Sequence, residues 1–315
     1  MSGAYSDLKE LVGLRFKARD LALFKHNRSR SLLAGTGISP FKGRGVDFEE
    51  VRAYQHGDDI RSIDWRVTAR RSKPHTKVFR EERERPVLIL LDQSHSLFFG
   101  SRLNFKSVTA AEACSLLAWA TLNHGDRIGG VVFNEEQLSE IRPKRSKQTL
   151  MHLLKKASEH NQSLEAKSIP ASIASASGGY LAKALRHARR VSHPGSHIFV
   201  ISDFAQHNEE TLRHFSRLSR HCELVAVHVS DPMEAELPLP GRYDITNGVH
   251  RQTIETRSGK IRQKYRQQYE QYTSNLKEQF SSLKIPFIRL QTDLDTSAQL
   301  TEYFGSVRSR QGTRG

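Results

Sequence analysis

Three oxygen-bearing side chains stand at alternate positions in the stretch VLILLDQSHSLFFG, residues 87–100. They are Asp92, Ser94 and Ser96, and they follow directly after five apolar residues. A short apolar run of this kind is typical of a strand buried on both faces, so the polar residues belong to the loop after it. Carboxylate and hydroxyl oxygens are the ligands that hard divalent cations prefer. The spacing therefore predicts part of a site for Mg²⁺ or Mn²⁺.

A second carboxylate, Asp203, stands near the end of another apolar run, HIFVISDF. In a doubly wound sheet, ligands bind beyond the carboxyl ends of the strands, where the strand order reverses. In the usual order of such sheets, the strands at 87–92 and 197–204 are neighbours at that point, so their carboxylates face one crevice. Close, buried carboxylates repel each other, and a divalent cation removes that cost. We therefore predict four metal ligands, Asp92, Ser94, Ser96 and Asp203.

The same residues also fit a purely structural role. Ser94 and Ser96 would then cap a helix that we expect to begin near residue 103, and Asp92 would lie at the positive end of that helix. The alternating spacing alone leaves both interpretations open. The second strand ending in a carboxylate favours the cation site.

Positioning these side chains requires a parallel sheet, and the order of apolar patterns predicts one. Strands and helices alternate after Pro86, which favours a doubly wound, mainly parallel α/β fold. A strand at 137–143 is expected to pair as a hairpin with the strand at 127–133. Parallel strands are expected at 87–92, 127–133, 197–204, 222–229 and 285–290. Helices are expected at 103–124, 146–160, 179–192, 208–220 and 258–283, with a short hairpin at 242–257.

The last of these helices carries an aromatic stripe. Tyr265, Tyr269, Tyr272, Leu276 and Phe280 recur at helical spacing. We interpret the stripe as a face packed into the core rather than as a cofactor site.

Four segments divide the chain. Residues 1–34 are expected to be helical, and residues 35–85 are charged but contain enough apolar side chains to pack alongside the main domain. Residues 86–305 form the α/β domain. Residues 306–315 are predicted to be a disordered basic tail.

Composition limits the classes of function. The 315 residues carry a formal net charge of +15, which favours acidic partners, but no nucleic-acid-binding signature accompanies it. There is no Walker loop, no Gly-x-Ser-x-Gly elbow and no complete catalytic set, so we do not expect an enzyme. No apolar run approaches the roughly 20 residues of a membrane helix, and the amino terminus lacks an apolar signal core. We therefore expect a cytoplasmic protein without a membrane span.

Upstream of the predicted sheet lies a more distinctive pattern. Gly43-Arg44-Gly45, followed by DFEEVRAYQHGDDIRSIDWRVTAR at 47–70, resembles the signature of the bacterial domain of unknown function 58 family. Asp92, Ser94, Ser96 and Asp203 also resemble the metal-ion-dependent adhesion site of von Willebrand factor A domains. The resemblance covers roughly residues 35–230. It implies a von Willebrand factor A-like fold and a MoxR-type AAA+ ATPase as partner.

The chain departs from that site at one position. Von Willebrand factor A domains place a threonine after two glycines at the start of a helix, whereas SGGYLAKAL has Tyr180 there. A phenol is too long to take the same coordination position. A water in its place, weak metal binding and loss of the metal all remain open, and Ser177 is a candidate replacement.

These patterns lead to a functional expectation. We expect a non-enzymatic protein-interaction module with a cation-dependent site, which acts with the ATPase on a client protein. A metal-dependent phosphodiesterase or nucleic-acid-binding protein, which would use the same carboxylates and the basic surface, ranks lower because it lacks a general base and a recognition motif. In a third interpretation the metal site is vestigial and the segment at 43–85 alone docks the partner.

Overall fold

The computed structural model describes residues 3–23, 46–55, 60–70, 73–81, 85–165, 179–246 and 251–305. Gly43–Gly45 of the family signature, Ser177 and the tail at 306–315 lie outside the described residues. The chain divides into two compact units. One combines Met1–Lys25 with Arg85–Gly315, and the other is His26–Glu84.

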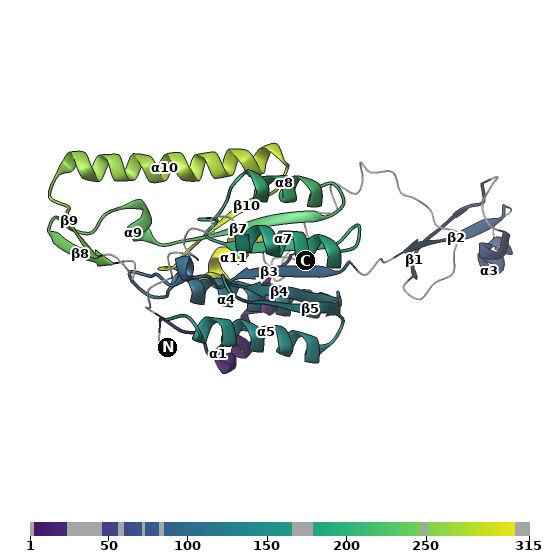
Figure 1. Cartoon of the computed structure of the whole chain (residues 1–315). Coiled ribbons are helices and arrows are strands. Elements are labelled where there is room, and N and C mark those ends of the chain that lie inside the picture. Colours follow the sequence, from purple (N-terminus) through teal and green to yellow (C-terminus); the bar gives the residue numbers. More distant parts are fainter. Residues whose placement is uncertain are drawn as a thin grey trace, which may run out of the picture. The chain divides into compact units, whose positions relative to one another are not determined.

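A six-stranded sheet forms the centre of the larger unit (Figure 1). All neighbouring strands are parallel except β4 and β5, which are antiparallel. The prediction of a doubly wound, mainly parallel α/β sheet is thus confirmed, as is the hairpin partner at its edge. In spatial order the strands are β10 (Phe287–Gln291), β7 (Glu223–Ser230), β6 (His197–Ser202), β3 (Val87–Asp92), β4 (Ile128–Phe133) and β5 (Leu138–Lys144).

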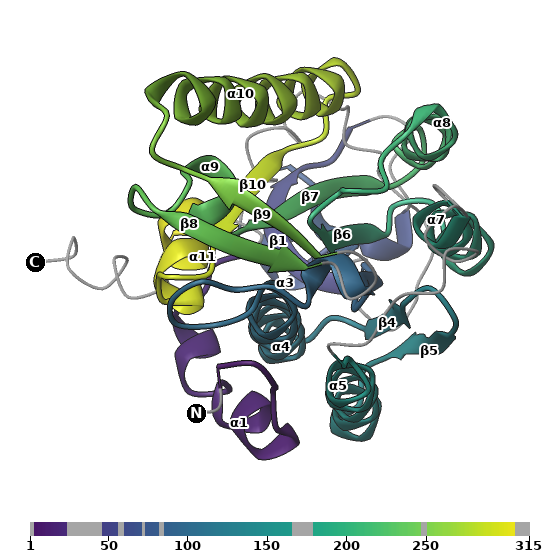
Figure 2. The ribbon, with the colours of Figure 1, turned by 60° about the vertical axis from the view of Figure 1, so that its left-hand side comes forward.

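Helices cover both faces of this sheet, which explains the apolar run in β3. Alternate residues of a strand point to opposite faces, so Ile89 and Leu91 enter one core while Leu88 and Leu90 enter the other. The first core is closed by α4 (Lys106–His124), α5 (Lys147–Gln162) and α11 (Thr296–Phe304). The second is closed by α7 (Gly179–Val191), α8 (Glu209–Leu218) and α10 (Gly259–Ser282). Figure 2 shows the two groups of helices on opposite sides of the sheet.

The amino-terminal segment differs from the expected helix over residues 5–34. Its described part contains only α1 (Leu8–Gly13) and the 3-10 turn η1 (Lys17–Asp20). Glycine is a poor helix former, and the break after Gly13 lets both Leu11 and Ala18 bury in the core beside α4. The segment therefore packs on the larger unit as two short turns.

The smaller unit is a hairpin with a helical connection. Strands β1 (Val46–Ala53) and β2 (His75–Glu81) pair in antiparallel fashion, and η2 (Ile60–Ser62) and α3 (Trp65–Thr68) lie between them in the chain. The side chain of Asp64 accepts hydrogen bonds from the backbone N–H groups of Arg66 and Val67, at 3.0 and 3.2 Å. Asp64 of the signature therefore caps α3.

The segment between β7 and β10 begins at the carboxyl end of β7. It contains the short helix α9 (Pro232–Ala235), the hairpin of β8 (Arg242–Thr246) and β9 (Arg251–Glu255), and the long helix α10. Of the aromatic stripe on α10, only Leu276 and Phe280 are buried. The interpretation of the three tyrosines as core residues is therefore wrong. Among the described helices, none is long and apolar enough to span a bilayer.

Candidate metal centre

The strand order brings the two predicted carboxylates to one edge of the sheet. β3 and β6 are parallel neighbours, and Leu91 of β3 lies opposite Ile201 of β6. Asp92 is the last residue of β3, and Asp203 directly follows β6. Both side chains therefore leave adjacent strands at the same edge, as the sequence predicted.

Asp92 is a buried carboxylate held by hydrogen bonds alone. Its side chain is 1% exposed. Oδ1 accepts from the Ser94 N–H at 3.0 Å, and Oδ2 accepts from the Ser202 hydroxyl at 2.6 Å. Burial and the nearby charge of Asp203 raise the pKa of Asp92 to about 7. Among the described residues, Asp92 has no ion-pair partner.

The two predicted hydroxyl ligands lie beside each other. Ser94 Oγ is 3.1 Å from Ser96 Oγ, in the loop that contains the 3-10 turn η3 (His95–Leu97). Neither serine caps α4, because Phe105 occupies the N-cap position of that helix without a side-chain hydrogen bond. The capping alternative is therefore wrong for α4.

Asp203 has a partner that the sequence did not reveal. Its Oδ2 accepts a hydrogen bond of 2.8 Å from Lys106 Nζ, and the same ammonium donates to Glu234 Oε1 at 2.6 Å. Burial opposes ionisation of Asp203, but the charge of Lys106 outweighs it and lowers the pKa of Asp203. Lys106 is itself only 3% exposed, and its pKa is raised by these two carboxylates in spite of burial.

Lys106 and Glu234 were missed for a physical reason. Lysine is a common residue at the exposed start of a helix, and nothing in its local sequence marks this one as buried. The one weak signal is that no other basic side chain follows Lys106 within the next three turns, where Glu112 is the only charged residue.

Tyr180 lies at the same crevice, in the first turn of α7. It is 8% exposed, and its ring centroid is 6.3 Å from that of Phe133. Burial, followed by the charge of Asp92, raises the pKa of the Tyr180 hydroxyl. The structure thus brings all five predicted positions together, with the phenol neutral at physiological pH.

The loop between Asp92 and Ser96 is fixed from both sides. The Gln93 side chain donates to the Ser107 carbonyl and accepts from Asn161 Nδ2, both at 3.0 Å. On the other side, Glu135 accepts from the backbone N–H of His95 at 2.9 Å. These contacts place the serine hydroxyls before any ligand arrives.

The donor set fits a partly hydrated hard cation. In the part of the chain that the structure describes, no group of three or more His, Cys, Asp or Glu side chains is placed to hold a metal ion. A cation here would depend on Asp92, on the two hydroxyls and on water, with Asp203 already engaged by Lys106. Mg²⁺ and Mn²⁺ accept such oxygen ligands and retain waters, whereas Zn²⁺ favours nitrogen and sulfur.

Comparison with known families settles the relationship that the signature suggested. Residues 50–275 match the model of the family described as Protein of unknown function DUF58. The chain belongs to this family.

Similar proteins occur in mycobacteria. Uncharacterized proteins of Mycobacterium bovis and Mycobacterium tuberculosis are 26% identical over 294 residues, which cover 92% of this chain and 88% of theirs. Among solved structures, the conserved hypothetical protein BatB from Bacteroides thetaiotaomicron is 18% identical, with a TM-score of 0.41, over 68% of this chain and 92% of its own. An aerotolerance-related membrane protein from Bacteroides fragilis is 17% identical, with a TM-score of 0.42, over 69% and 94%. Both TM-scores are too low to assign a shared fold.

Proposed function

We propose that this DUF58 protein is a non-enzymatic interaction module that binds a divalent cation, Mg²⁺ or Mn²⁺, at the carboxyl edge of its sheet. The supporting observation is Asp92, a buried carboxylate that has no cationic partner among the described residues, beside two hydroxyls and a second carboxylate. Such a group is costly to ionise alone, and a bound cation would stabilise its charged form. Asp92, Ser94 and Ser96 would hold the cation, and Asp203 would add negative charge from the neighbouring strand.

A cation with an open position recruits an acidic side chain. The bound cation would supply a Lewis-acidic contact that a partner carboxylate completes. The formal charge of +15 would steer acidic surfaces toward the protein. By family resemblance, the proposed partner is a MoxR-type AAA+ ATPase, with which the protein would remodel or activate a client in the cytoplasm.

The proposal is tested by a pull-down with a MoxR-type AAA+ ATPase from the same organism. We expect retention in 5–10 mM Mg²⁺, as an order-of-magnitude choice for a cation that binds weakly to protein oxygens, and loss in a chelator. Asp92→Ala should lose the partner, whereas Asp244→Asn, which removes an exposed carboxylate that is hydrogen-bonded to Thr253, should retain it. Equal retention of the ATPase by Asp92→Ala would remove the metal bridge from the account.

A metal-dependent phosphodiesterase or nucleic-acid-binding function remains the lower-ranked candidate. The same carboxylates and the net positive charge support it. Magnesium-dependent cleavage of DNA or RNA, abolished by Asp92→Ala, would favour it over the interaction module.

A further inference from the structure

A cavity lies beside the candidate metal centre and shares Asp203 with it. It measures about 430 Å³ and lies between α10 and the carboxyl ends of β6 and β7. Its wall includes three tyrosines from one face of α10, two carboxylates and one buried imidazole. The residues that matter here are Tyr265, Tyr269, Tyr272, Asp203, Glu234 and His228.

Two of the three tyrosines that line this cavity are held by hydrogen bonds from their hydroxyls. Tyr265 donates its hydroxyl hydrogen to the Met233 carbonyl at 2.9 Å, and Tyr272 donates to the Asp203 carbonyl at 3.3 Å. Tethering of these two hydroxyls fixes ring positions that would otherwise be mobile. Tyr272 is still 39% exposed, so the cavity opens to solvent. An aromatic wall with a wet opening suits a ligand that enters from another molecule.

The floor of the cavity carries excess negative charge. Asp203 and Glu234 share the single ammonium of Lys106, and among the described residues neither carboxylate has a second ion-pair partner. His228 is 2% exposed, and burial lowers its pKa to about 4, so it adds no positive charge at neutral pH. Within the described part of the chain, its buried Nδ1 has no hydrogen-bond partner. The cavity therefore offers negative charge and aromatic faces together.

We infer that this cavity receives a positively charged side chain of a partner protein, with arginine preferred over lysine. A planar guanidinium stacks on tyrosine rings and donates several hydrogen bonds in fixed directions, whereas an ammonium is a compact point charge. The inference rests on the proposed function only in taking this edge of the sheet as the binding face. It does not depend on a bound metal.

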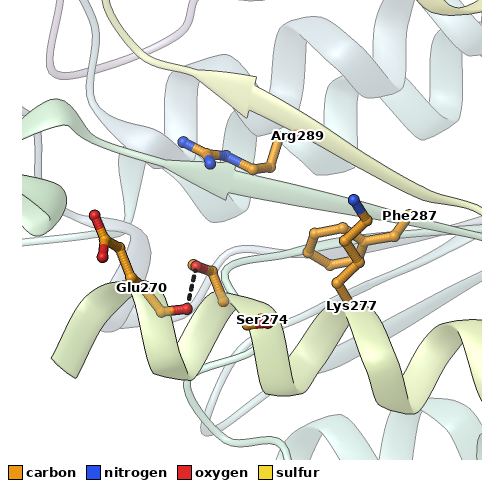
Figure 3. A pocket seen from close by; sticks show the side chains of 6 residues that line it. Glu270, Ser274, Lys277, Phe287 and Arg289 are labelled. Carbon is orange, nitrogen blue, oxygen red and sulfur yellow. Dashed lines mark hydrogen bonds between the residues drawn. The ribbon is translucent and has the colours of Figure 1, made fainter. Parts of the chain in front are cut away.

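A neighbouring cavity has the opposite character and makes the assignment specific. It measures about 290 Å³ and lies farther along α10, between that helix and β10. Figure 3 shows Lys277 from α10 and Arg289 from β10 at this cavity, together with Glu270. In the part of the chain that the structure describes, neither cation is ion-paired. An arginine side chain would be repelled there, so its entry should be confined to the tyrosine cavity.

The test is a titration followed by NMR of the protein with labelled tyrosine rings, in the presence of a chelator. The probe is N-acetyl-arginine methylamide, and the control is the citrulline derivative, which has nearly the same shape without the charge. We expect the arginine derivative to shift the ring signals of Tyr265, Tyr269 and Tyr272, with a Kd on the order of 1–10 mM, as befits one isolated side chain. The citrulline derivative should bind at least about fivefold more weakly.

Two variants locate the interaction. Tyr272→Leu removes one aromatic face, and Glu234→Gln removes the excess negative charge while keeping a hydrogen-bond acceptor for Lys106. Each should weaken the arginine derivative at least about fivefold, whereas Lys277→Met, in the neighbouring cavity, should not weaken it. Equal binding of arginine and citrulline, no shift at the three tyrosines, or unaltered binding by both variants would overturn the inference. A separate Mg²⁺ titration of the same proteins, without the chelator, reports on Asp92, so failure of the metal proposal is distinguished from failure of this one.

Discussion

Lys106 forms ion pairs with two carboxylates in the crevice. Its ammonium is almost fully buried and neutralises charge on Asp203 and Glu234 at once. A buried charge left without its partner is costly, because neither water nor a counter-ion replaces the lost contact. The stability of the crevice therefore depends on this lysine whether or not a cation binds.

Replacement of Lys106 by methionine should therefore be strongly destabilising. We expect a loss of about 3–5 kcal/mol in the free energy of unfolding, since two carboxylates lose their shared partner. Urea denaturation followed by circular dichroism measures it. Lys147→Met is the matched control, because Lys147 is also the first residue of its helix but is exposed; its effect should stay within about 0.5 kcal/mol. Similar losses in both variants would contradict the assigned role.

His228 predicts a pH dependence of stability. Its pKa is lowered by burial to about 4 in the folded protein, against 6.5 for an exposed histidine. As pH falls, the unfolded chain therefore binds a proton at this histidine before the folded protein does. The free energy of unfolding is unaffected by this group above about pH 6.5 and decreases between about pH 6.5 and 4. From pH 7.5 to 5, this one group should cost about 2 kcal/mol.

His228→Phe isolates that contribution from the other histidines. The imidazole is stacked against the rings of Phe204 and Phe287, with centroids 6.2 and 5.5 Å away, so phenylalanine fits the site. The variant should lose about 2 kcal/mol less than wild type over the same pH interval in urea denaturation. An identical slope in the two proteins would show that folding does not lower the pKa of His228.

At the scale of elements, a buried polar chain links the amino-terminal segment to the metal loop. The Ser6 N–H donates to Asn161 Oδ1 at 2.6 Å, and Asn161 Nδ2 donates to the side chain of Gln93, next to Asp92. Ser158 of the same helix donates to the Ser6 carbonyl at 3.1 Å. Ser6, which precedes α1, thereby helps to position the loop after β3.

Asn161→Leu should break this chain. It leaves the Ser6 N–H and the Gln93 amide oxygen without partners in a buried place, which we expect to cost about 1–3 kcal/mol. Amide hydrogen exchange should also be faster in the loop at 93–97, while β7 on the other half of the sheet stays protected. Unchanged exchange in that loop would separate the amino-terminal segment from the site.

The elements that sequence predicted best are those whose burial is set by their own pattern. The run VLILL is apolar at every position because both faces of β3 are covered, and the alternation with helices indicated a parallel sheet. The stripe on α10 misled because three tyrosines at helical spacing do not reveal whether they face a core or a cavity. In the described part of the amino-terminal segment, the predicted continuous helix was wrong because α1 and η1, two separate short elements, bury Leu11 and Ala18.

The sequence predicted where the candidate site lies but not how its charges are balanced. The four proposed ligands and Tyr180 follow from strand ends and a family motif, and the structure brings them together. Lys106 comes from a helix start and Glu234 from an insertion after β7, and only the tertiary fold places them beside Asp203. Sequence spacing does not indicate that Lys106 and Glu234 lie beside Asp203.

At the scale of the whole molecule, a chain with a net positive charge contains a local cluster of carboxylates. The formal charge of +15 is spread over the sequence, whereas Asp92, Asp203 and Glu234 gather at one edge of the sheet around a single lysine. Such an arrangement steers acidic surfaces toward the molecule while concentrating cations at one point. The proposed function requires both properties.

Isothermal titration of Mg²⁺ and Mn²⁺ into the protein tests the central claim most directly. We predict one saturable site in the wild type, a loss of affinity of about tenfold or more in Asp92→Asn and in Ser96→Ala, and wild-type binding in the Asp244→Asn control. Binding of neither cation at millimolar concentration, or equal binding by wild type and Asp92→Asn, would contradict a metal site at the carboxyl edge of this sheet.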